Sequence, residues 1–341
     1  MALRLGFIGT GGISNRHLTT AMDSPDMEIV GVCDIVPERA QGAAEKYGGT
    51  PFTSFTDLYD TVKPDALVIC TPPFGHGEIE EEAAKRGLPF FVEKPVAVDM
   101  AMAARVLKAV RDASLTTQVG YMFRLAEPLI KVREMLATRA VAMIQAHYYM
   151  PGLPGPTWWP KMELGGGQLI EQTTHMLDLG RFLAGDVVSV SGRTATVRDW
   201  THAPAGYEPE GLLKYSPIFE IPDTTALAMQ YASGALGTVS CSIVPQANWD
   251  VGFKVVADGL IVTIEGASAS WAGDENGSMN PGDDWAAYVL REFTDAVATG
   301  GKTSIPYEEG VKSLAVSVAG YESVKKGGCP CDLADILPEG L

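Results

Sequence analysis

Cationic residues are scarce in this chain of 341 residues, which has 26 Lys and Arg against 42 Asp and Glu and a formal net charge of -16. Because nucleic acids and anionic membranes are polyanions, such a chain is a poor general binder of either. The sequence also lacks any apolar run of the roughly 18–20 residues that a helix needs to cross a bilayer. Together these absences favour a small molecule over nucleic acid or a membrane as partner.

Cysteines are also few, five in all, and most of them lie in apolar runs that are typical of reduced, buried thiols. The pair in Cys329-Pro330-Cys331 has no Cys or His neighbours in the sequence to complete a metal site, so we expect no metal. After Met1-Ala2 the chain passes directly into the apolar run Leu3–Ile8, without the basic segment of a secretory signal. We therefore expect a cytoplasmic protein.

The length favours two domains, and 46% hydrophobic against 20% charged residues is typical of globular chains. In the first 120 residues, short continuous apolar runs alternate with helix-like stretches, which predicts a doubly wound parallel sheet of the Rossmann type in residues 1–120. The expected strands are Leu3–Ile8, Glu28–Cys33, Ala66–Cys70, Phe90–Val92 and Thr117–Val119. The expected helices are Arg16–Met22, Pro37–Tyr47, Phe55–Thr61, Gly77–Lys85 and Asp99–Arg111.

Residues 121–341 show consecutive strand-like segments with few helices between them, which predicts an α+β domain with an open, mainly antiparallel sheet. The expected strands are Ala142–Tyr149, Val187–Val197, Thr224–Tyr231, Ala235–Ile243, Val251–Val256 and Leu260–Ile264. The expected helices are Gln168–Leu183, Trp285–Ala298 and Glu308–Lys325. Three stretches rich in Gly and Pro are predicted to be loops, namely Pro151–Pro160, His202–Pro222 and Gly266–Asp283.

The first candidate motif is Gly9-Thr10-Gly11-Gly12-Ile13-Ser14, between the first expected strand and helix. Glycines there allow a tight turn and let a pyrophosphate approach the helix N-terminus. Asp34, with Ile35 beside it, ends the next strand, where a carboxylate accepts hydrogen bonds from ribose hydroxyls and repels a 2′-phosphate. These residues predict NAD rather than NADP, although Arg39 is near enough in sequence to serve a 2′-phosphate. The alternative is an ordinary strand–turn–helix with a surface aspartate.

Two further motifs follow strands at the edge where doubly wound sheets bind ligands. Thr71-Pro72-Pro73 and His76 are predicted to contact the cofactor, or else form a proline-stiffened loop with a capping histidine. Glu93-Lys94-Pro95 is predicted to contact cofactor and substrate, with Lys94 binding a substrate oxygen and helping a neighbouring base to lose its proton. Its alternative is a surface ion pair between Glu93 and Lys94.

The fourth motif runs from Gly165 to Asp178 and places three glycines before an expected helix. Glu171, His175 and Asp178 share one face at helical spacing, and Gln172 lies beside them. A histidine between carboxylates suits the acceptance of a proton at neutral pH. The alternatives are a structural histidine, or a metal site for which no further ligands are evident.

Candidate substrate contacts surround this motif in the sequence. Trp158 and Trp159 offer an apolar wall for a sugar ring or the nicotinamide, or else anchor their loop. Tyr121 and Arg124 stand at the expected domain crossover, where Arg124 either reaches the substrate or is a surface charge.

The order and spacing of the four motifs resemble the Gfo/Idh/MocA family of dehydrogenases along essentially the whole chain. The resemblance implies NAD(P)-dependent oxidation of a secondary alcohol of a sugar, polyol or cyclitol, or the reverse reduction, by a homodimer or homotetramer associated through the open sheet. It implies that Lys94 orients the substrate and that His175 is the acid/base. Glu171 stands where the family usually has aspartate, and Ser14 stands at the third glycine position of the turn, where the family has Gly or Ala. Two other readings remain: a redox-assisted glycosidase or lyase, which cleaves a bond without net NADH, and a sensor of sugars or dinucleotides, which needs neither Lys94 nor His175.

Overall fold

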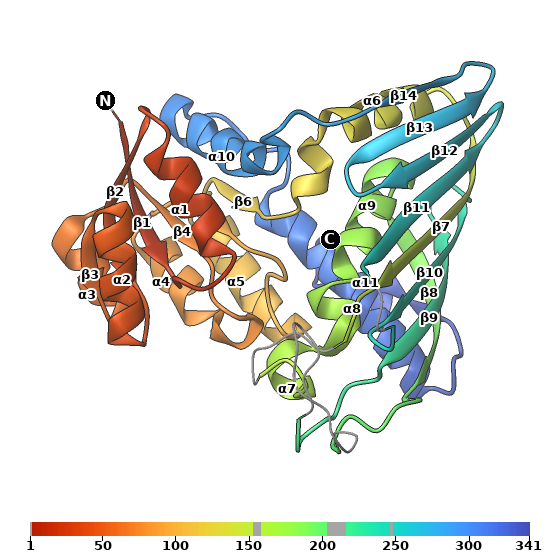
Figure 1. The fold of residues 1–341 in the computed structure, drawn as a ribbon, viewed down its shortest axis with the longest axis horizontal. Helices are drawn as coiled ribbons and strands as arrows, with labels where there is room; N and C mark the ends of the chain where they lie inside the picture. Colours follow the sequence, from red (N-terminus) through yellow and green to blue (C-terminus); the bar gives the residue numbers. More distant parts are fainter. Residues whose placement is uncertain (1, 153–157, 203–215, 246–247) are drawn as a thin grey trace. The chain divides into compact units, whose positions relative to one another are not determined.

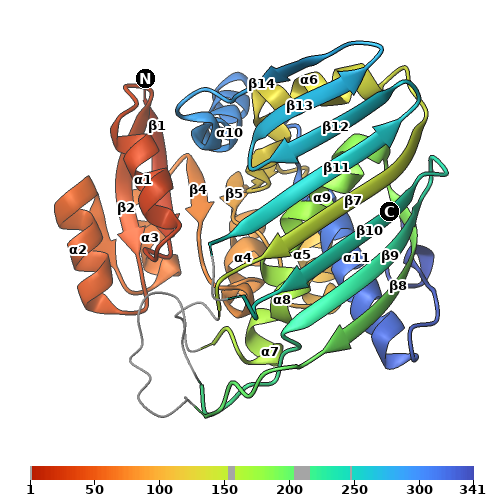
Figure 2. The same cartoon turned by 45° about the vertical axis from the view of Figure 1, so that its right-hand side comes forward.

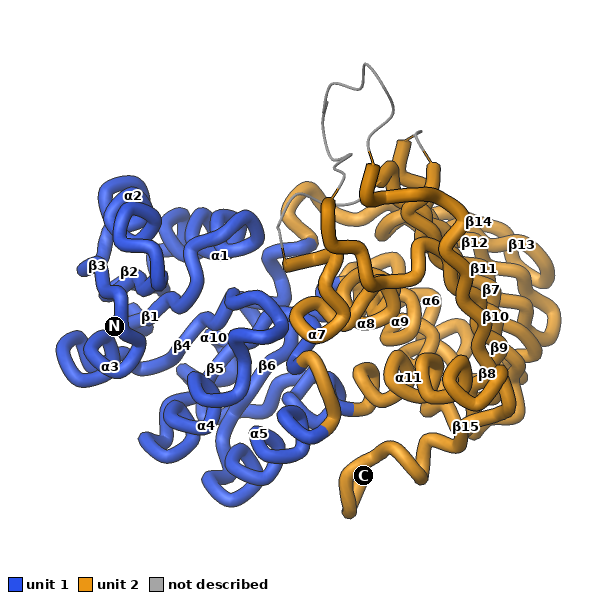
Figure 3. The backbone as a smooth tube through the Cα atoms, turned by 90° about the horizontal axis from the view of Figure 1, so that it is seen from below, with its two compact units in different colours: residues 1–97, 101–122, 286–311 blue, residues 98–100, 123–285, 312–341 orange. Residues whose placement is uncertain are grey.

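The computed structural model of the chain describes residues 2–152, 158–202, 216–245 and 248–341. They form two compact units, shown in different colours in Figure 3. The first unit also includes the segment Ala286–Val311 from far along the sequence. The expected division of the chain into domains 1–120 and 121–341 therefore stays a prediction. The first unit comprises Met1–Ala97, Ala101–Met122 and Ala286–Val311, and the second Val98–Met100, Phe123–Trp285 and Lys312–Leu341.

Six parallel strands form the sheet of the first unit in the order β3-β2-β1-β4-β5-β6 (Figure 1). Every residue of β4 and β5 is buried, as expected for strands covered on both faces. The strand order reverses between β1 and β4, and such a switch point is where doubly wound sheets bind ligands. The strands are β1 Leu3–Ile8, β2 Met27–Cys33, β3 Thr50–Phe52, β4 Ala66–Ile69, β5 Phe90–Val92 and β6 Thr117–Val119.

Residues that favour the start or the end of a helix stand at the ends of α2 and at the start of α3. Pro37 occupies the first turn of α2, and Gly48, with φ of +92°, ends that helix. The Ser54 hydroxyl accepts the backbone N–H of Asp57 at 3.2 Å and caps α3. The helices are α1 Ser14–Met22, α2 Pro37–Tyr47, α3 Phe55–Val62, α4 Glu78–Lys85, α5 Met100–Asp112 and α10 Tyr288–Thr299, with 3-10 turns η1 Pro73–Gly75 and η3 Trp285–Ala287.

The second unit is built on a nine-stranded sheet in the order β14-β13-β12-β11-β7-β10-β9-β8-β15 (Figure 2). Neighbouring strands are antiparallel except β7 and β10, which are parallel. The strands are β7 Val141–Tyr149, β8 Val187–Ala195, β9 Thr224–Tyr231, β10 Leu236–Ser242, β11 Asp250–Ala257, β12 Leu260–Glu265, β13 Ser268–Gly273, β14 Gly277–Met279 and β15 Cys331–Asp332. The prediction of a Rossmann-type parallel sheet followed by a mainly antiparallel one is confirmed.

One face of the nine-stranded sheet is covered by helices and the other is open. Alternate residues of β9 are buried, and α8 and α9 pack on β7 and β10. On the open face, Met143, Leu236 and Ile261 are 42%, 53% and 49% exposed. The helices are α6 Glu127–Leu136, α7 Met162–Gly165, α8 Gly167–Glu171, α9 Thr174–Ala184 and α11 Tyr307–Lys325, which runs on from the first unit, with 3-10 turns η2 Met122–Leu125 and η4 Leu333–Asp335.

Several elements differ from the sequence-based expectation. The stretch expected as the loop Gly266–Asp283 contains strands β13 and β14, and β3 and α6 are additional elements. In the β13–β14 hairpin, Gly277 lies against the ring of Trp271, where a Cβ would come within 2.7 Å. Small and polar residues there carry little strand signal, and pairing with β12 supplies the order instead. Residues 153–157 and 203–215 of the other two expected loops lie outside the described residues.

Candidate active site

The glycine-rich turn joins β1 to α1 and fits a dinucleotide pyrophosphate. Gly9 has φ of +85°, and a Cβ there would lie 2.6 Å from the carbonyl oxygen of Cys70. By contrast, a Cβ on Gly11 or Gly12 would meet no atom of the described residues within 4 Å, which leaves room for a ligand. The Ser14 hydroxyl donates to the carbonyl oxygen of Gly11 at 2.6 Å, so this departure from glycine closes the turn. No side chain of the described residues caps α1, whose first N–H groups therefore suit an anion.

Asp34 follows β2 and ties its end to the glycine-rich turn. Its Oδ2 accepts the backbone N–H and the hydroxyl of Thr10 at 3.0 and 2.9 Å, and Oδ1 accepts the backbone N–H of Val36 at 3.0 Å. The carboxylate is therefore fixed beside the turn, as a ribose-binding acceptor needs to be. Ile35 is 87% exposed and Arg39 is exposed on α2, so both are accessible to a ligand.

His76 is buried and contacts the carboxylate of Glu80. Its Nδ1 lies 2.6 Å from Oε1 of Glu80, and both side chains are fully buried. The second Glu80 oxygen accepts the backbone N–H of Gly77 at 2.7 Å and caps α4. Thr71 and Pro72 are half-buried after β4, while Pro73 is buried in η1. Glu80 rather than His76 supplies the cap, and contact of this loop with a cofactor stays a prediction.

Lys94 directly follows Glu93 at the carboxyl end of β5 and is half-buried. Glu93 is buried and contacts His17 at 2.7 Å and the backbone N–H of Lys94 at 3.1 Å. Glu93 is therefore a buried carboxylate with partners of its own, and not one half of a surface ion pair with the Lys94 side chain. The Lys94–Pro95 peptide bond is cis.

The expected helix Gln168–Leu183 is broken between its two proposed catalytic residues. α8 ends at Glu171, and α9 begins at Thr174 and carries His175. At the break, the backbone N–H of Thr173 reaches the carbonyl oxygen of Gln168 at 2.9 Å, five residues back instead of four. The prediction that Glu171 and His175 share the face of one helix is therefore wrong.

His175 on α9 is buried and contacts an aromatic ring. His175 is 7% exposed, and the ring of Phe123 meets it edge to face at a centroid distance of 5.5 Å. The ring of Trp285 stacks on Phe123 at 5.4 Å. Glu171 is likewise buried, at 8% exposure. Burial and the packing of Phe123 restrict the imidazole, which suits an acid/base that must keep one orientation.

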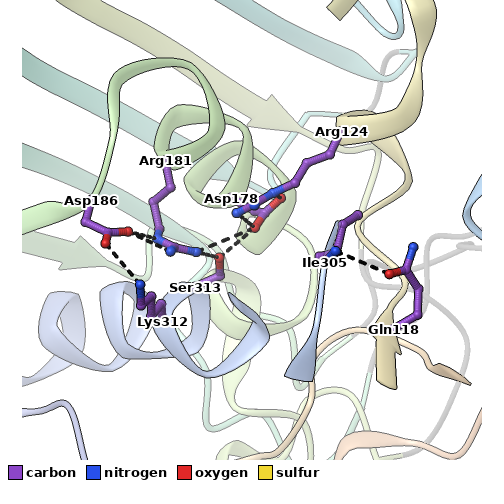
Figure 4. A network of polar contacts seen from close by, with 8 residues as sticks. All are labelled: Gln118, Arg124, Asp178, Arg181, Asp186, Ile305, Lys312 and Ser313. Atoms are coloured by element: carbon purple, nitrogen blue, oxygen red, sulfur yellow. Dashed lines mark hydrogen bonds and ion pairs between the residues drawn. The ribbon is translucent and has the colours of Figure 1, made fainter. Parts of the chain in front are cut away.

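One turn after His175, Asp178 is the centre of a buried polar network (Figure 4). Arg124 donates to both its oxygens, from Nε at 2.8 Å and from a terminal nitrogen at 2.7 Å. The hydroxyl of Ser313 adds a bond of 2.7 Å, and Arg181 in turn donates to Ser313 at 2.7 Å and to Asp186 at 2.6 Å. Asp178 therefore anchors α9 to η2 and α11. The sequence pattern predicts a different role for this carboxylate, that of a partner for the imidazole of His175.

Arg124, proposed from the sequence to bind substrate, donates two guanidinium hydrogen bonds to Asp178 and is 7% exposed. Its contact with a substrate stays a prediction. Tyr121, proposed for the same role, is 1% exposed. The rings of Trp158 and Trp159 stack on each other at a centroid distance of 5.4 Å, and Trp159 is 5% exposed; contact of this pair with a substrate stays a prediction.

Tyr148 and Phe123 were not singled out from the sequence, although Tyr148 bonds to a residue at the helix break and Phe123 contacts His175. The Tyr148 hydroxyl donates to the side-chain oxygen of Gln172 at 2.8 Å. Burial, and to a lesser extent the nearby Glu171, raise the pKa of Tyr148 well above its usual range, so the hydroxyl remains a donor. The alternation along β7 is the signal that places Tyr148 on the covered face. No comparable signal points to Phe123.

Among the described residues, no group of three His, Cys, Asp or Glu side chains is arranged to hold a metal ion. Within the same residues, none of the helices has both the length and the apolar character needed to cross a membrane.

Two family models match the chain. The first, described as an oxidoreductase family with an NAD-binding Rossmann fold, matches residues 3–121. The second, the C-terminal domain of the same family, matches residues 131–271. The chain belongs to the GFO/IDH/MocA oxidoreductase family. The expectation of an oxidoreductase with an NAD-binding Rossmann domain is thereby confirmed.

Other GFO/IDH/MocA proteins are similar along nearly their full lengths. Inositol 2-dehydrogenase of Rhizobium meliloti (strain 1021) is 25% identical over 95% of this chain and 97% of its own. Inositol 2-dehydrogenase of Rubrobacter xylanophilus is 26% identical over 95% and 92%. Levoglucosan dehydrogenase in complex with NADH has a TM-score of 0.83 at 20% identity, over 98% and 99% of the two chains. The WlbA dehydrogenase of Bordetella pertussis, with NADH and UDP-GlcNAcA, has a TM-score of 0.80 at 24% identity, over 97% and 99%. These two structures show the shared fold.

Proposed function

We propose that the protein is an NAD-dependent dehydrogenase that transfers hydride between a secondary alcohol of a sugar, polyol or cyclitol and nicotinamide. The observation that carries the proposal is the full-length similarity to inositol 2-dehydrogenases, in a chain with Lys94 two residues after the end of β5 and His175 on α9. Both residues suit alcohol oxidation, which must remove a proton from oxygen as hydride leaves carbon.

The roles follow from the chemistry of the side chains. Bound NAD supplies the hydride acceptor. His175, held by Phe123, takes the hydroxyl proton of the substrate, and Lys94 stabilises the negative charge that develops on its oxygen. Glu171, buried like His175, orients the substrate or the imidazole. Trp158 and Trp159 form the apolar wall against the ring of the substrate.

Asp34 favours NAD in this proposal. Its carboxylate accepts hydrogen bonds from ribose hydroxyls, and its charge repels the 2′-phosphate of NADP. The fixed position of the carboxylate beside the glycine-rich turn supports this role. Arg39, exposed on α2, is the residue that would moderate the preference.

We also propose that the protein forms a homodimer or homotetramer through the open face of the nine-stranded sheet. Large apolar side chains on that face, including Met143, Leu236 and Ile261, are exposed in the single chain. Apolar patches of this kind mark association surfaces.

The direct test is the appearance of NADH during incubation of the purified protein with NAD and monosaccharides, inositols or anhydrosugars, with NADP in parallel. A rise in NADH absorbance with one class establishes dehydrogenation and names the substrate class. Cofactor binding with no oxidation of any alcohol would contradict the proposal. Cleavage of glycosides without net NADH would support the redox-assisted reaction instead.

Two substitutions test the assigned roles once a substrate is known. His175→Ala and Lys94→Ala should each lower kcat by roughly 10²–10⁴-fold, the contribution of a positioned acid/base or charge, with little change in the Kd for NAD. Lys108→Ala, at a lysine whose side chain is 76% exposed, is the matched control and should leave kcat unchanged. Wild-type turnover in His175→Ala would remove that residue from the reaction.

A further inference from the structure

A buried histidine that the proposed reaction does not use lies on α1, within a turn of its start. His17 is 1% exposed, and its ring lies 4.8 Å from the ring of Phe91 in β5. Its Nε2 lies 2.7 Å from Oε1 of Glu93, the residue that follows β5. Because a buried polar group costs free energy unless it is hydrogen-bonded, the contact with Glu93 is what makes a histidine tolerable here.

The other ring nitrogen of His17 indicates which partner donates. Nδ1 is buried and has no hydrogen-bond partner among the described residues. A proton on Nδ1 alone would bury an N–H without an acceptor and leave Nε2 and the Glu93 carboxylate as two facing acceptors. A proton on Nε2 leaves only a lone pair unmatched, which costs less. The bond therefore runs from Nε2–H of His17 to Glu93.

The Glu93 carboxylate is enclosed by two further groups of the first unit. Its Oε2 accepts the backbone N–H of Lys94 at 3.1 Å. A Cβ on Gly120, just after β6, would lie 2.7 Å from the same oxygen, so only glycine leaves room for the carboxylate. Glu93 is 6% exposed as a result. One buried carboxylate thus joins α1 to the backbone of Lys94.

We infer that His17 is a positioning residue, which holds Glu93 and, through it, the backbone at Lys94; the inference rests on the proposed role of Lys94. Without the N–H donor, Glu93 would be a buried charge with one hydrogen bond fewer, and turning toward water would relieve it. That rotation would break the bond to the Lys94 amide and loosen the base of the lysine side chain. Since a small misplacement of a reacting group lowers turnover strongly, the loss should be in kcat.

Two substitutions at His17 separate a hydrogen bond from simple filling of space. His17→Leu removes the donor, whereas His17→Gln places an amide N–H near the position of Nε2. We expect kcat to fall by about 10- to 100-fold in His17→Leu, the loss of one charge-assisted hydrogen bond, and to recover largely in His17→Gln. KM for the alcohol and the Kd for NAD should change little. Equal loss in both variants, or a loss confined to NAD affinity, would overturn the inference.

A second measurement does not depend on activity. The acylation rate of individual lysines, followed by mass spectrometry of peptides, reports how each amine is placed, with exposed Lys108 as internal reference. In His17→Leu, the rate at Lys94 should change by about threefold or more relative to Lys108, and His17→Gln should restore it. If His17→Leu does not fold, His17→Asn, whose amide is too short to reach Glu93, takes its place. An unchanged rate at Lys94 would refute the positioning role even in an active dehydrogenase. If the wild-type protein oxidises no alcohol while the rate does change, the proposed function fails and the positioning stands.

Discussion

Replacing Arg124 with methionine tests whether its buried ion pair with Asp178 holds the helix that carries His175. The two side chains are 8% and 2% exposed, and two hydrogen bonds of 2.8 and 2.7 Å join them. Methionine keeps much of the apolar stem but leaves the Asp178 carboxylate with the hydroxyl of Ser313. The variant therefore removes one partner of a buried pair and preserves most of its volume.

Breaking a buried pair in this way costs roughly 3–5 kcal/mol, because a charge stays buried without its partner. Arg181 lies 3.8 Å from the same Asp178 oxygen and offsets part of that loss, so we expect about 3 kcal/mol, the lower end of the range. The double variant Arg124→Met/Asp178→Leu should recover much of the loss, since neither charge remains. Lys325→Ala, at an exposed ion pair of the same unit, should cost less than about 0.5 kcal/mol.

Two compact units need not unfold together, so the measurement has to report on α9 itself. Native-state hydrogen exchange of peptides from Thr174–Ala184, at increasing urea concentrations, gives the free energy of opening of that helix. Turnover should fall in parallel, because His175 stands one turn before Asp178. The reasoning is refuted if Arg124→Met opens α9 within about 0.5 kcal/mol of the wild type, or if the double variant is less stable than the single one.

Three further predictions concern the cofactor, acid stability and assembly. Asp34→Ala should raise the Kd for NAD by about 10- to 100-fold, which corresponds to the loss of a charged hydrogen bond, and should narrow the preference for NAD over NADP. Titration of the variant with both cofactors measures these changes. An unchanged preference for NAD would remove Asp34 from the ribose site. Burial alone would raise the pKa of Asp186, but Arg181 lowers this pKa below its usual value. The Asp186 carboxylate therefore contributes its full stability above about pH 5, and this contribution is lost as the pH falls through the pKa of the folded state. The difference in Tm between wild type and Asp186→Asn should therefore shrink on acidification, and a difference independent of pH would contradict this. Leu236→Lys/Ile261→Lys should convert the oligomer to monomers in light scattering; an unchanged mass would exclude the open sheet face as the interface.

The elements of the first unit could be predicted closely because their signals are local. Continuous apolar runs give β1 and β5 their buried strands, and the punctuation of Pro37 and Gly48 gives α2 its ends. The exception is β3, three residues long with Pro51 at its centre, which forms only because β2 offers it an edge. Strand formation that depends on a neighbour in space leaves no periodic signal in the chain.

Where the candidate residues lie in the fold, after β2 and β5 and on a helix of the second unit, could be predicted as well, but their hydrogen-bond partners could not. His17 meets Glu93 across 76 residues of sequence, and Arg124 meets Asp178 across 54. Helical spacing instead suggested that Asp178 would act on His175, which lies three residues away. A carboxylate binds the donor that packing brings to it, and spacing along one helix does not determine that packing.

The break between α8 and α9 changes how the departure at Glu171 has to be understood. On one continuous helix, the extra methylene of glutamate, relative to the aspartate usual in the family, would shift the carboxylate along a face shared with His175. Here α8 is held separately, since the Ser317 hydroxyl donates to the carbonyl oxygen of Leu169 at 2.9 Å, while Arg124 anchors α9 through Asp178. The two helices can therefore set the carboxylate and the imidazole independently. A longer acidic side chain on α8 is therefore compatible with the acid/base role that we propose for His175 on α9.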